Sequence, residues 1–198
     1  MLVLTAALIA KCGAQAVQRK HLITTFGGGG GFTAMDTNID SLDAQGAETG
    51  SMRLAFAYAI TDRWSLGVHY DRIGTDRTSS RTESLRFTTY MFEGTYRPWI
   101  GQRGALEVQL AFGPSLMALK PWGQGLPLKT QSTALSFGAH YLYMVSGTLG
   151  AFVSVDHTAS RSSRITDYNG QPITDAENNA MQLDWNSQRV NTGLVVRF

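Results

Sequence analysis

Residues 52–71 read MRLAFAYAITDRWSLGVHYD, two alternating segments joined by a short turn. Every second residue is large and apolar or aromatic: Met52, Leu54, Phe56, Tyr58 and Ile60 in the first segment, and Trp64, Leu66, Val68 and Tyr70 in the second. The residues between them are small or ionisable, such as Ala55, Gly67 and His69. A period of two is that of a β-strand, so this stretch predicts a β-hairpin that turns at residues 61–63.

The same alternation recurs in LEVQLAFG (106–113) and LSFGAHYLYMV (135–145). A soluble β-sandwich would carry Lys, Glu and Thr on its outer face. Here the second face is mostly Gly, Ala and Ser with isolated charges, as in a narrow polar lumen whose bulky outer face meets lipid. The sequence therefore predicts an all-β, membrane-spanning barrel.

Eight such segments are expected, near residues 22–34, 48–60, 64–75, 83–96, 104–118, 130–145, 148–160 and 183–198. The connections alternate between short turns (61–63, 97–103, 146–148) and long polar loops (35–47, 73–83, 119–129, 159–182). This asymmetry is typical of an up-and-down antiparallel barrel with periplasmic turns and extracellular loops. Aromatic residues are expected in two girdles: Trp64, Tyr96, Trp99, Tyr143 and Phe198 at the short-turn ends, and Tyr70, Trp122 and Trp185 toward the long loops.

Length and composition agree with one exported domain. The chain has 198 residues, 43% hydrophobic and 16% charged, with a formal net charge of +2 that gives no reason to expect nucleic-acid binding. Residues 1–16, MLVLTAALIAKCGAQA, predict an export signal that ends in the A-x-A spacing of Ala14 and Ala16, which leaves 17–198 as the barrel domain. The single cysteine, Cys12, lies inside that signal, so no disulfide is expected.

The last eight residues, NTGLVVRF, place a polar residue, a glycine, a hydrophobic residue and a terminal aromatic at Asn191, Gly193, Val196 and Phe198. This ending resembles the C-terminal assembly signal of bacterial outer-membrane barrels. Together with the strand count, it makes the chain similar to the small eight-stranded porin-family barrels of the OmpA, OmpX and OmpW type. The resemblance implies an outer-membrane location with both termini periplasmic, and edge-on recognition of these four residues by the barrel-assembly machinery.

Charged residues at the inward positions predict a lumen network of Arg53, His69, Asp71, Glu93, Glu107, His140, Asp156, Arg189 and Arg197. If the first turn lies between Ile60 and Trp64, Arg53 faces Asp71 and the two form a charge pair. We favour a structural network that fills the interior over a gated pore or a proton-sensitive plug, because an eight-stranded barrel is just wide enough for side chains.

Two further motifs leave alternatives open. The glycine run FGGGGGF (26–32) is explained by a bend or close approach of another group, with a lateral slot for a small apolar ligand as the alternative. Loop arginines could contact lipopolysaccharide phosphates or belong to solvated loops; they are Arg72, Arg77, Arg81, Arg86, Arg161 and Arg164. The last loop, 159–182, is expected to be mobile and to offer a partner-binding surface.

Little in the sequence suggests catalysis. The segment DHTAS places Ala159 where a lipid A deacylase-like site would need Ser two residues after His157. No catalytic residue, metal ligand set or cofactor is therefore expected. The expected function is non-enzymatic: an envelope-structural, surface-contact or accessory-subunit role, the last of these within an outer-membrane protein complex. A narrow channel for small or apolar solutes is the first alternative, and a lipid-modifying enzyme is the second.

Overall fold

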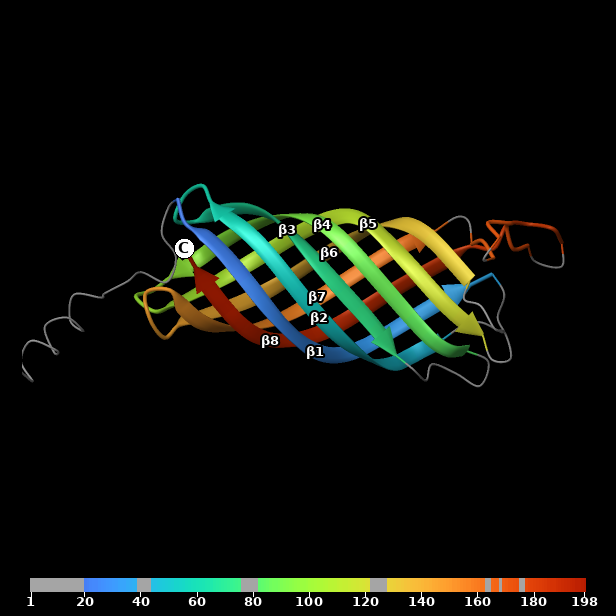
Figure 1. The fold of residues 1–198 in the computed structure, drawn as a ribbon, viewed down its shortest axis with the longest axis horizontal. Helices are drawn as coiled ribbons and strands as arrows, with labels where there is room; N and C mark the ends of the chain where they lie inside the picture. Colours follow the sequence, from blue (N-terminus) through green and yellow to red (C-terminus); the bar gives the residue numbers. More distant parts are fainter. Residues whose placement is uncertain are drawn as a thin grey trace, which may run out of the picture.

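The computed structural model is a closed barrel of eight antiparallel strands, each hydrogen-bonded to its sequence neighbours and β1 to β8 (Figure 1). It describes residues 20–38, 44–75, 82–121, 128–162, 165–167, 169–174 and 177–198. The strands are β1 (Leu22–Thr37), β2 (Ala44–Ala59), β3 (Trp64–Thr75), β4 (Thr82–Ile100), β5 (Gly104–Pro121), β6 (Leu128–Met144), β7 (Leu149–Ser162) and β8 (Leu183–Arg197). The predicted fold class is confirmed, whereas the expected export signal lies outside the described residues.

One predicted turn is wrong. Residues 97–103 were expected to form a turn, but β4 continues to Ile100 with a register shift between Tyr96 and Trp99. This shift contains Pro98, which cannot donate a hydrogen bond to a neighbouring strand. The Arg97 amide still donates to the Arg63 carbonyl at 2.8 Å, and its side chain points into the barrel. Arg97 therefore belongs to the interior.

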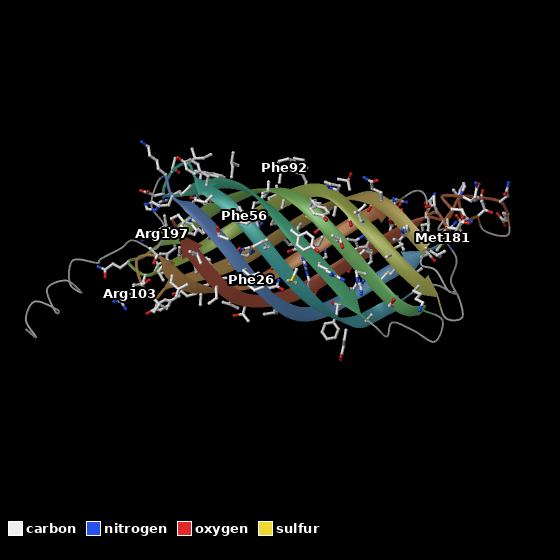
Figure 2. The ribbon with its side chains drawn as sticks, viewed as in Figure 1. Phe26, Phe56, Phe92, Arg103, Met181 and Arg197 are labelled. Carbon is white, nitrogen blue, oxygen red and sulfur yellow. The ribbon has the colours of Figure 1, made fainter. Side chains whose placement is uncertain are left out.

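The two ends of the barrel differ. The short-turn end holds the connections between β2 and β3, β4 and β5, and β6 and β7, together with the C-terminus (Figure 1). The long-loop end holds the other connections. Between the ends, the outer surface is covered by exposed aliphatic and aromatic side chains, among them Phe26, Phe56 and Phe92 (Figure 2). Such a band is what a lipid bilayer requires of a barrel exterior. In the described part of the chain, no helix has the length and apolarity needed to cross a membrane.

The interior is built in three layers. At the short-turn end lies an apolar layer of Ile23, Ala59, Ala105, Leu142, Met144, Phe152 and Val195. At the long-loop end lies a larger apolar layer, which includes Met35, Ile73, Phe87, Leu119, Ile165, Met181 and Trp185. Most of the buried charged side chains lie between these two apolar layers, although Arg97 and Arg197 reach the short-turn end. Buried hydroxyl side chains such as Thr130 and Ser162 lie among the upper apolar residues. We refer to the two apolar layers as the lower and the upper apolar layer, and to the buried charged side chains with their hydrogen-bonding partners as the polar layer.

Trp185 corrects the predicted aromatic girdle. It was expected at the lipid interface, but it is 2% exposed and stacks on Phe87 inside the barrel, with ring centroids 4.0 Å apart. The cause is strand parity, because Trp185 lies on the same face of β8 as Arg189. Trp122 of the same predicted girdle lies outside the described residues.

The glycine run is explained by close approach of β8. Gly29 and Gly31 lie on the inward-facing positions of β1, and a Cβ at either would overlap a carbonyl oxygen of β8, that of Val190 or of Gln188. Close approach of another strand, the explanation favoured from the sequence, therefore accounts for the inward-facing glycines of the 26–32 segment. Glycine here lets the first and last strands meet closely.

We expect Gly29→Ala to lower the free energy of unfolding by about 1–3 kcal/mol, the usual cost of overpacking, because the β8 backbone cannot move away without breaking the closing ladder. Urea titration of the barrel in phospholipid vesicles measures this change. Gly50→Ala is the matched control, since an added Cβ there meets its nearest atom at 4.0 Å. Equal stability of the two variants would contradict the close-approach explanation.

Candidate functional site

The polar layer is assembled by register. Arg53 pairs with Asp71 across β2 and β3, and His140 pairs with Ser154 across β6 and β7, as the turn positions predicted. The structure buries all nine side chains of the predicted lumen network, each 7% exposed or less: Arg53, His69, Asp71, Glu93, Glu107, His140, Asp156, Arg189 and Arg197. Arg197 lies apart from the centre, at the short-turn end, where its guanidinium donates to the Gly147 carbonyl.

Arg53 forms its ion pairs across the lumen instead of with its strand neighbour. Its guanidinium lies 3.2 Å from Asp156 and 3.4 Å from Glu93, and it donates to the Gln109 side-chain oxygen at 2.6 Å. Arg53 and Asp71 face each other and their charges attract, as predicted, but no direct ion pair joins the two. A strand neighbour on the same wall points parallel to Arg53, whereas a long side chain in a narrow barrel reaches the opposite wall.

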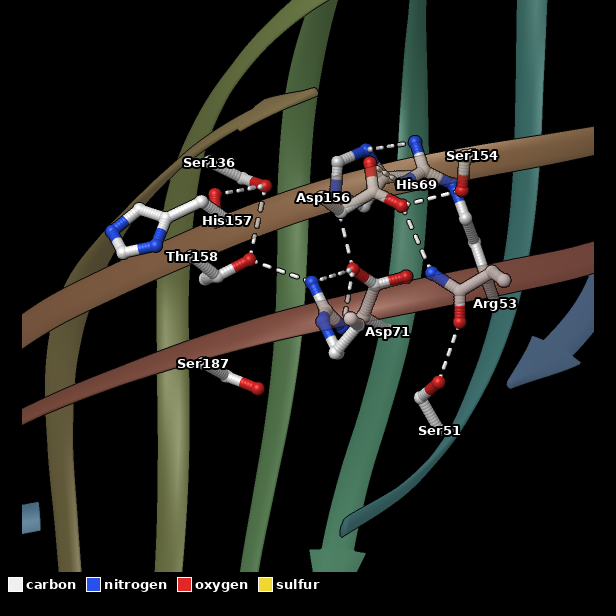
Figure 3. A network of polar contacts seen from close by, with 12 residues as sticks. Ser51, Arg53, His69, Asp71, Ser136, Ser154, Asp156, His157, Thr158 and Ser187 are labelled. Atoms are coloured by element: carbon white, nitrogen blue, oxygen red, sulfur yellow. Dashed lines mark hydrogen bonds and ion pairs between the residues drawn. The ribbon is translucent and has the colours of Figure 1, made fainter. Parts of the chain in front are cut away.

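Asp71 is paired with a different arginine. Both terminal nitrogens of Arg189 donate to one oxygen of Asp71 at 3.2 Å, and Arg189 also donates to the Thr158 hydroxyl at 2.6 Å (Figure 3). This arrangement links β3, β7 and β8.

Asp156 is the most connected carboxylate of the layer. It accepts hydrogen bonds from Ser154 at 2.6 Å and from Asn191 at 2.9 Å, and His140 lies 2.9 Å from it (Figure 3). Asn191 was predicted as the polar residue of the assembly signal. It is 1% exposed and also accepts from Ser51 at 2.5 Å, so it is an interior hydrogen-bonding residue as well.

Sequence reasoning missed two members of the layer. Arg97 donates from Nε to Glu107 at 2.6 Å and from Nη2 to Ser65 at 2.9 Å, and Gln109 contacts both Arg53 and Glu93. The strand period of two indicates both residues, because Arg97 lies four residues after Glu93 and Gln109 two after Glu107, each on the same inward face. Arg97 was missed because residues 97–103 were predicted to form a turn.

Ser154 and His140 do not form a nucleophile–base pair. Ser154 and His140 both contact Asp156, each through a different oxygen, so the carboxylate separates the hydroxyl from the imidazole. A nucleophile needs a base within hydrogen-bond reach. In the described ranges, no group of three His, Cys, Asp or Glu side chains is placed to hold a metal ion.

The polar layer encloses a small cavity. A cavity of about 20 Å³ lies among Arg53, Glu93, Arg97, Glu107 and His140. This volume is close to the minimum for one water molecule. This cavity therefore has room for about one water molecule among the charged side chains.

The other predicted site residues lie on the surface or at the strand ends. Phe198 is 69% exposed, and its backbone exchanges hydrogen bonds with Leu22 at 2.9 and 3.2 Å. Gly193 faces inward opposite Gly27, and Val196 faces outward. Of the predicted lipopolysaccharide contacts, Arg72 and Arg86 are exposed on the outer face and Arg161 pairs with Asp184 at 3.3 Å. The remaining three, Arg77, Arg81 and Arg164, lie outside the described residues.

No protein-family model and no curated protein matches this chain. Solved structures do. Neisserial surface protein A matches with a TM-score of 0.59 and 11% identity over 90% of this chain and 97% of that chain. OprG from Pseudomonas aeruginosa matches with a TM-score of 0.56 and 13% identity over 92% of this chain and 98% of that chain. Ail, the attachment invasion locus protein of Yersinia pestis, matches with a TM-score of 0.50 and 10% identity over 91% of this chain and 100% of that chain. The chain therefore has the fold of the small eight-stranded outer-membrane barrels, as the resemblance implied.

The Arg97–Glu107 pair offers a test of the polar layer. We expect Arg97→Met to destabilise the barrel by about 3–5 kcal/mol, because it leaves the Glu107 carboxylate buried without its cation. The double variant Arg97→Met/Glu107→Leu should recover most of this loss, since it removes both charges. Unfolding titrations of the two single variants and the double variant give the coupling energy, and additive losses would show that the two side chains do not interact.

The C-terminal residue offers a second test. We expect Phe198→Asp to reduce the yield of assembled barrel in cells severalfold, because it places a charge on the lipid-facing end of the closing strand. Heat-modifiable mobility on gels measures this yield. Gln171→Asp, an exposed change in the last loop, is the control and should assemble normally. Equal yields from both variants would remove the assembly-signal assignment.

Proposed function

We propose that this protein is a non-conducting, non-enzymatic barrel of the bacterial outer membrane that holds a contact surface at the cell exterior. The observation that supports this proposal best is the packing of the lumen by side chains. A conducting pore needs a continuous wetted path, whereas here an apolar layer covers the polar layer at the long-loop end and the charged side chains are buried in ion pairs and hydrogen bonds. The narrow-channel alternative accordingly has less support.

The membrane location and orientation belong to this proposal. The apolar exterior and the likeness to outer-membrane barrels support the outer membrane. Bacterial barrels carry short turns on the periplasmic side and long loops outside. We therefore assign the short-turn end, with the C-terminus, to the periplasm and the long-loop end to the exterior.

The connection between β7 and β8 is the best-supported contact surface. Its described ends are anchored, because Ile165 and Met181 are fully buried in the upper apolar layer. Thr166 and Lys129 exchange two backbone hydrogen bonds of 2.9 Å, which attach the loop to β6. Beyond these anchors the loop projects past the strands (Figure 1).

The projecting part has its own internal order. The Asp167 carboxylate accepts hydrogen bonds from the backbone amides of Asn169 and Gln171, both at 2.8 Å. The exposed side chains beyond this turn are mostly amides and other polar groups, including Asn169, Gln171, Asn178 and Asn179. A preformed loop loses less conformational entropy when it binds a partner. This favours a role in surface contact or as an accessory subunit over a purely structural one.

The enzyme alternative has weaker support. His157 faces outward and packs 5.0 Å from the Phe137 ring centroid, and Ala159 remains the next residue on that face. Ser160 points to the interior, where its hydroxyl bonds with Ser132 at 2.6 Å. The outward surface around His157 thus provides no neighbouring hydroxyl from β7.

We expect the purified, refolded protein to show no steady ion-dependent openings in planar bilayers at any applied voltage that the bilayer tolerates. A heat-modifiable gel shift verifies that the barrel is folded, and a general porin reconstituted in the same bilayers verifies the assay. Reproducible single-channel steps from the wild-type protein would contradict the closed lumen and restore the channel alternative.

A further inference from the structure

Three glycines lie side by side on the outer face of the barrel. Gly30 of β1 pairs with Gly50 of β2, and Gly50 pairs with Gly74 of β3. All three occupy outward positions, and the same row continues to Val190 on one side and Arg86 on the other. We call the strip over Gly30, Gly50 and Gly74 the glycine furrow.

Internal packing explains only part of the furrow, because a Cβ would be crowded at Gly30 but not at Gly50. A Cβ added to Gly50 would meet its nearest atom at 4.0 Å, and at Gly74 and Gly30 the nearest atoms are carbonyl oxygens at 3.4 and 3.3 Å. The inward Gly29 and Gly31, by contrast, have no room for a side chain. Glycine weakens a strand interior and often marks close approach of a ligand or another backbone. Gly50, and to a lesser degree Gly74, are therefore better explained by the approach of a molecule from outside the chain.

Side chains raise the borders of the furrow. Phe32 and Glu48 border it toward the long-loop end, and Met52 and Arg72 border it toward the short-turn end. At its β1 end the surface is hollowed by about 530 Å³ between Phe32, Glu48, Gln188 and Val190. Phe32 is 60% exposed and Met52 39%. A flat protein surface would meet these projecting side chains before it reached the glycines, whereas a slender hydrocarbon chain could lie between them.

The furrow has an apolar end and a cationic end. It begins at Val190, in the middle of β8, and ends at Arg86, which lies near the loop end of β4. The stem of Arg86 lies over Gly74, with its Cγ 3.8 Å from the position a Cβ would take. Arg72 is exposed beside Gly74 on β3. Among the described residues, no carboxylate forms an ion pair with Arg72 or Arg86, although Glu48 lies on the opposite border.

We propose that the glycine furrow binds lipopolysaccharide. One acyl chain lies along Gly30, Gly50 and Gly74, and a lipid A phosphate is held by the guanidinium groups of Arg72 and Arg86, which suit phosphate oxygens. This inference rests on the proposed orientation, which places the long-loop end and hence Arg86 in the outer leaflet. It narrows the arginine contacts expected from sequence to two residues and adds the groove that receives the chain.

The test uses the full barrel in detergent micelles and deep-rough lipopolysaccharide, with binding measured by native mass spectrometry. Gly50→Leu fills the furrow with a side chain that lipid tolerates. We expect it to weaken binding by about tenfold or more, equivalent to about 1.4 kcal/mol. Arg72→Gln/Arg86→Gln should weaken binding to a similar extent. Ala139→Leu, which adds the same kind of bulk to the exposed outer face of β6, should bind as the wild type does.

Several outcomes would overturn the inference. Wild-type affinity of Gly50→Leu would show that the furrow is not the site. Equal displacement by phosphatidylglycerol would show that any anionic lipid occupies it. Loss of a dimer in Gly50→Leu would identify a second copy of this chain as the occupant. None of these results affects the proposal that the lumen is closed, because bilayer conductance tests that proposal separately. Proteolysis of the 165–182 loop on intact cells tests the proposed orientation independently.

Discussion

Backbone hydrogen bonding in the absence of water is the constraint on which the rest of this structure depends. Inside a bilayer every amide and carbonyl must find a partner within the protein, so a β-sheet can cross only when its first and last strands pair. Here β1 and β8 pair from Ile23 to Thr37. That closure demands the inward glycines of β1, since a side chain at Gly29 or Gly31 would occupy the space of the β8 backbone.

Closure with eight strands also decides what the interior can contain. The lumen of such a barrel is just wide enough for side chains, so each buried charge needs an opposite charge from another strand. Arg53 and Arg189 supply such charges from opposite directions, one toward Glu93 and Asp156 and the other toward Asp71. Because the charged groups of this network are buried inside the barrel, their interactions form in a medium with little water, where they are stronger.

Strand periodicity predicted the barrel, its eight strands and the register of β2 on β3, because one tight turn determines which residues face each other. It could not predict the ion pairs. Arg53 reaches Asp156 across the lumen, and that contact depends on strand tilt and on how the strands close, which no single hairpin reveals. Arg97 and Trp185 were misplaced for a simpler reason: a proline and an aromatic residue were given more weight than the parity of their own strands.

Asn191 has a consequence for the order of assembly. It lies in the final strand, yet it bonds to Asp156 of β7 and to Ser51 of β2, on the far side of β1. A partly folded barrel that has not yet added β8 leaves the Asp156 carboxylate short of a donor and Asp71 short of Arg189. Such an intermediate is penalised by two incompletely satisfied acids, so sealing of the sheet and completion of its interior become a single cooperative event.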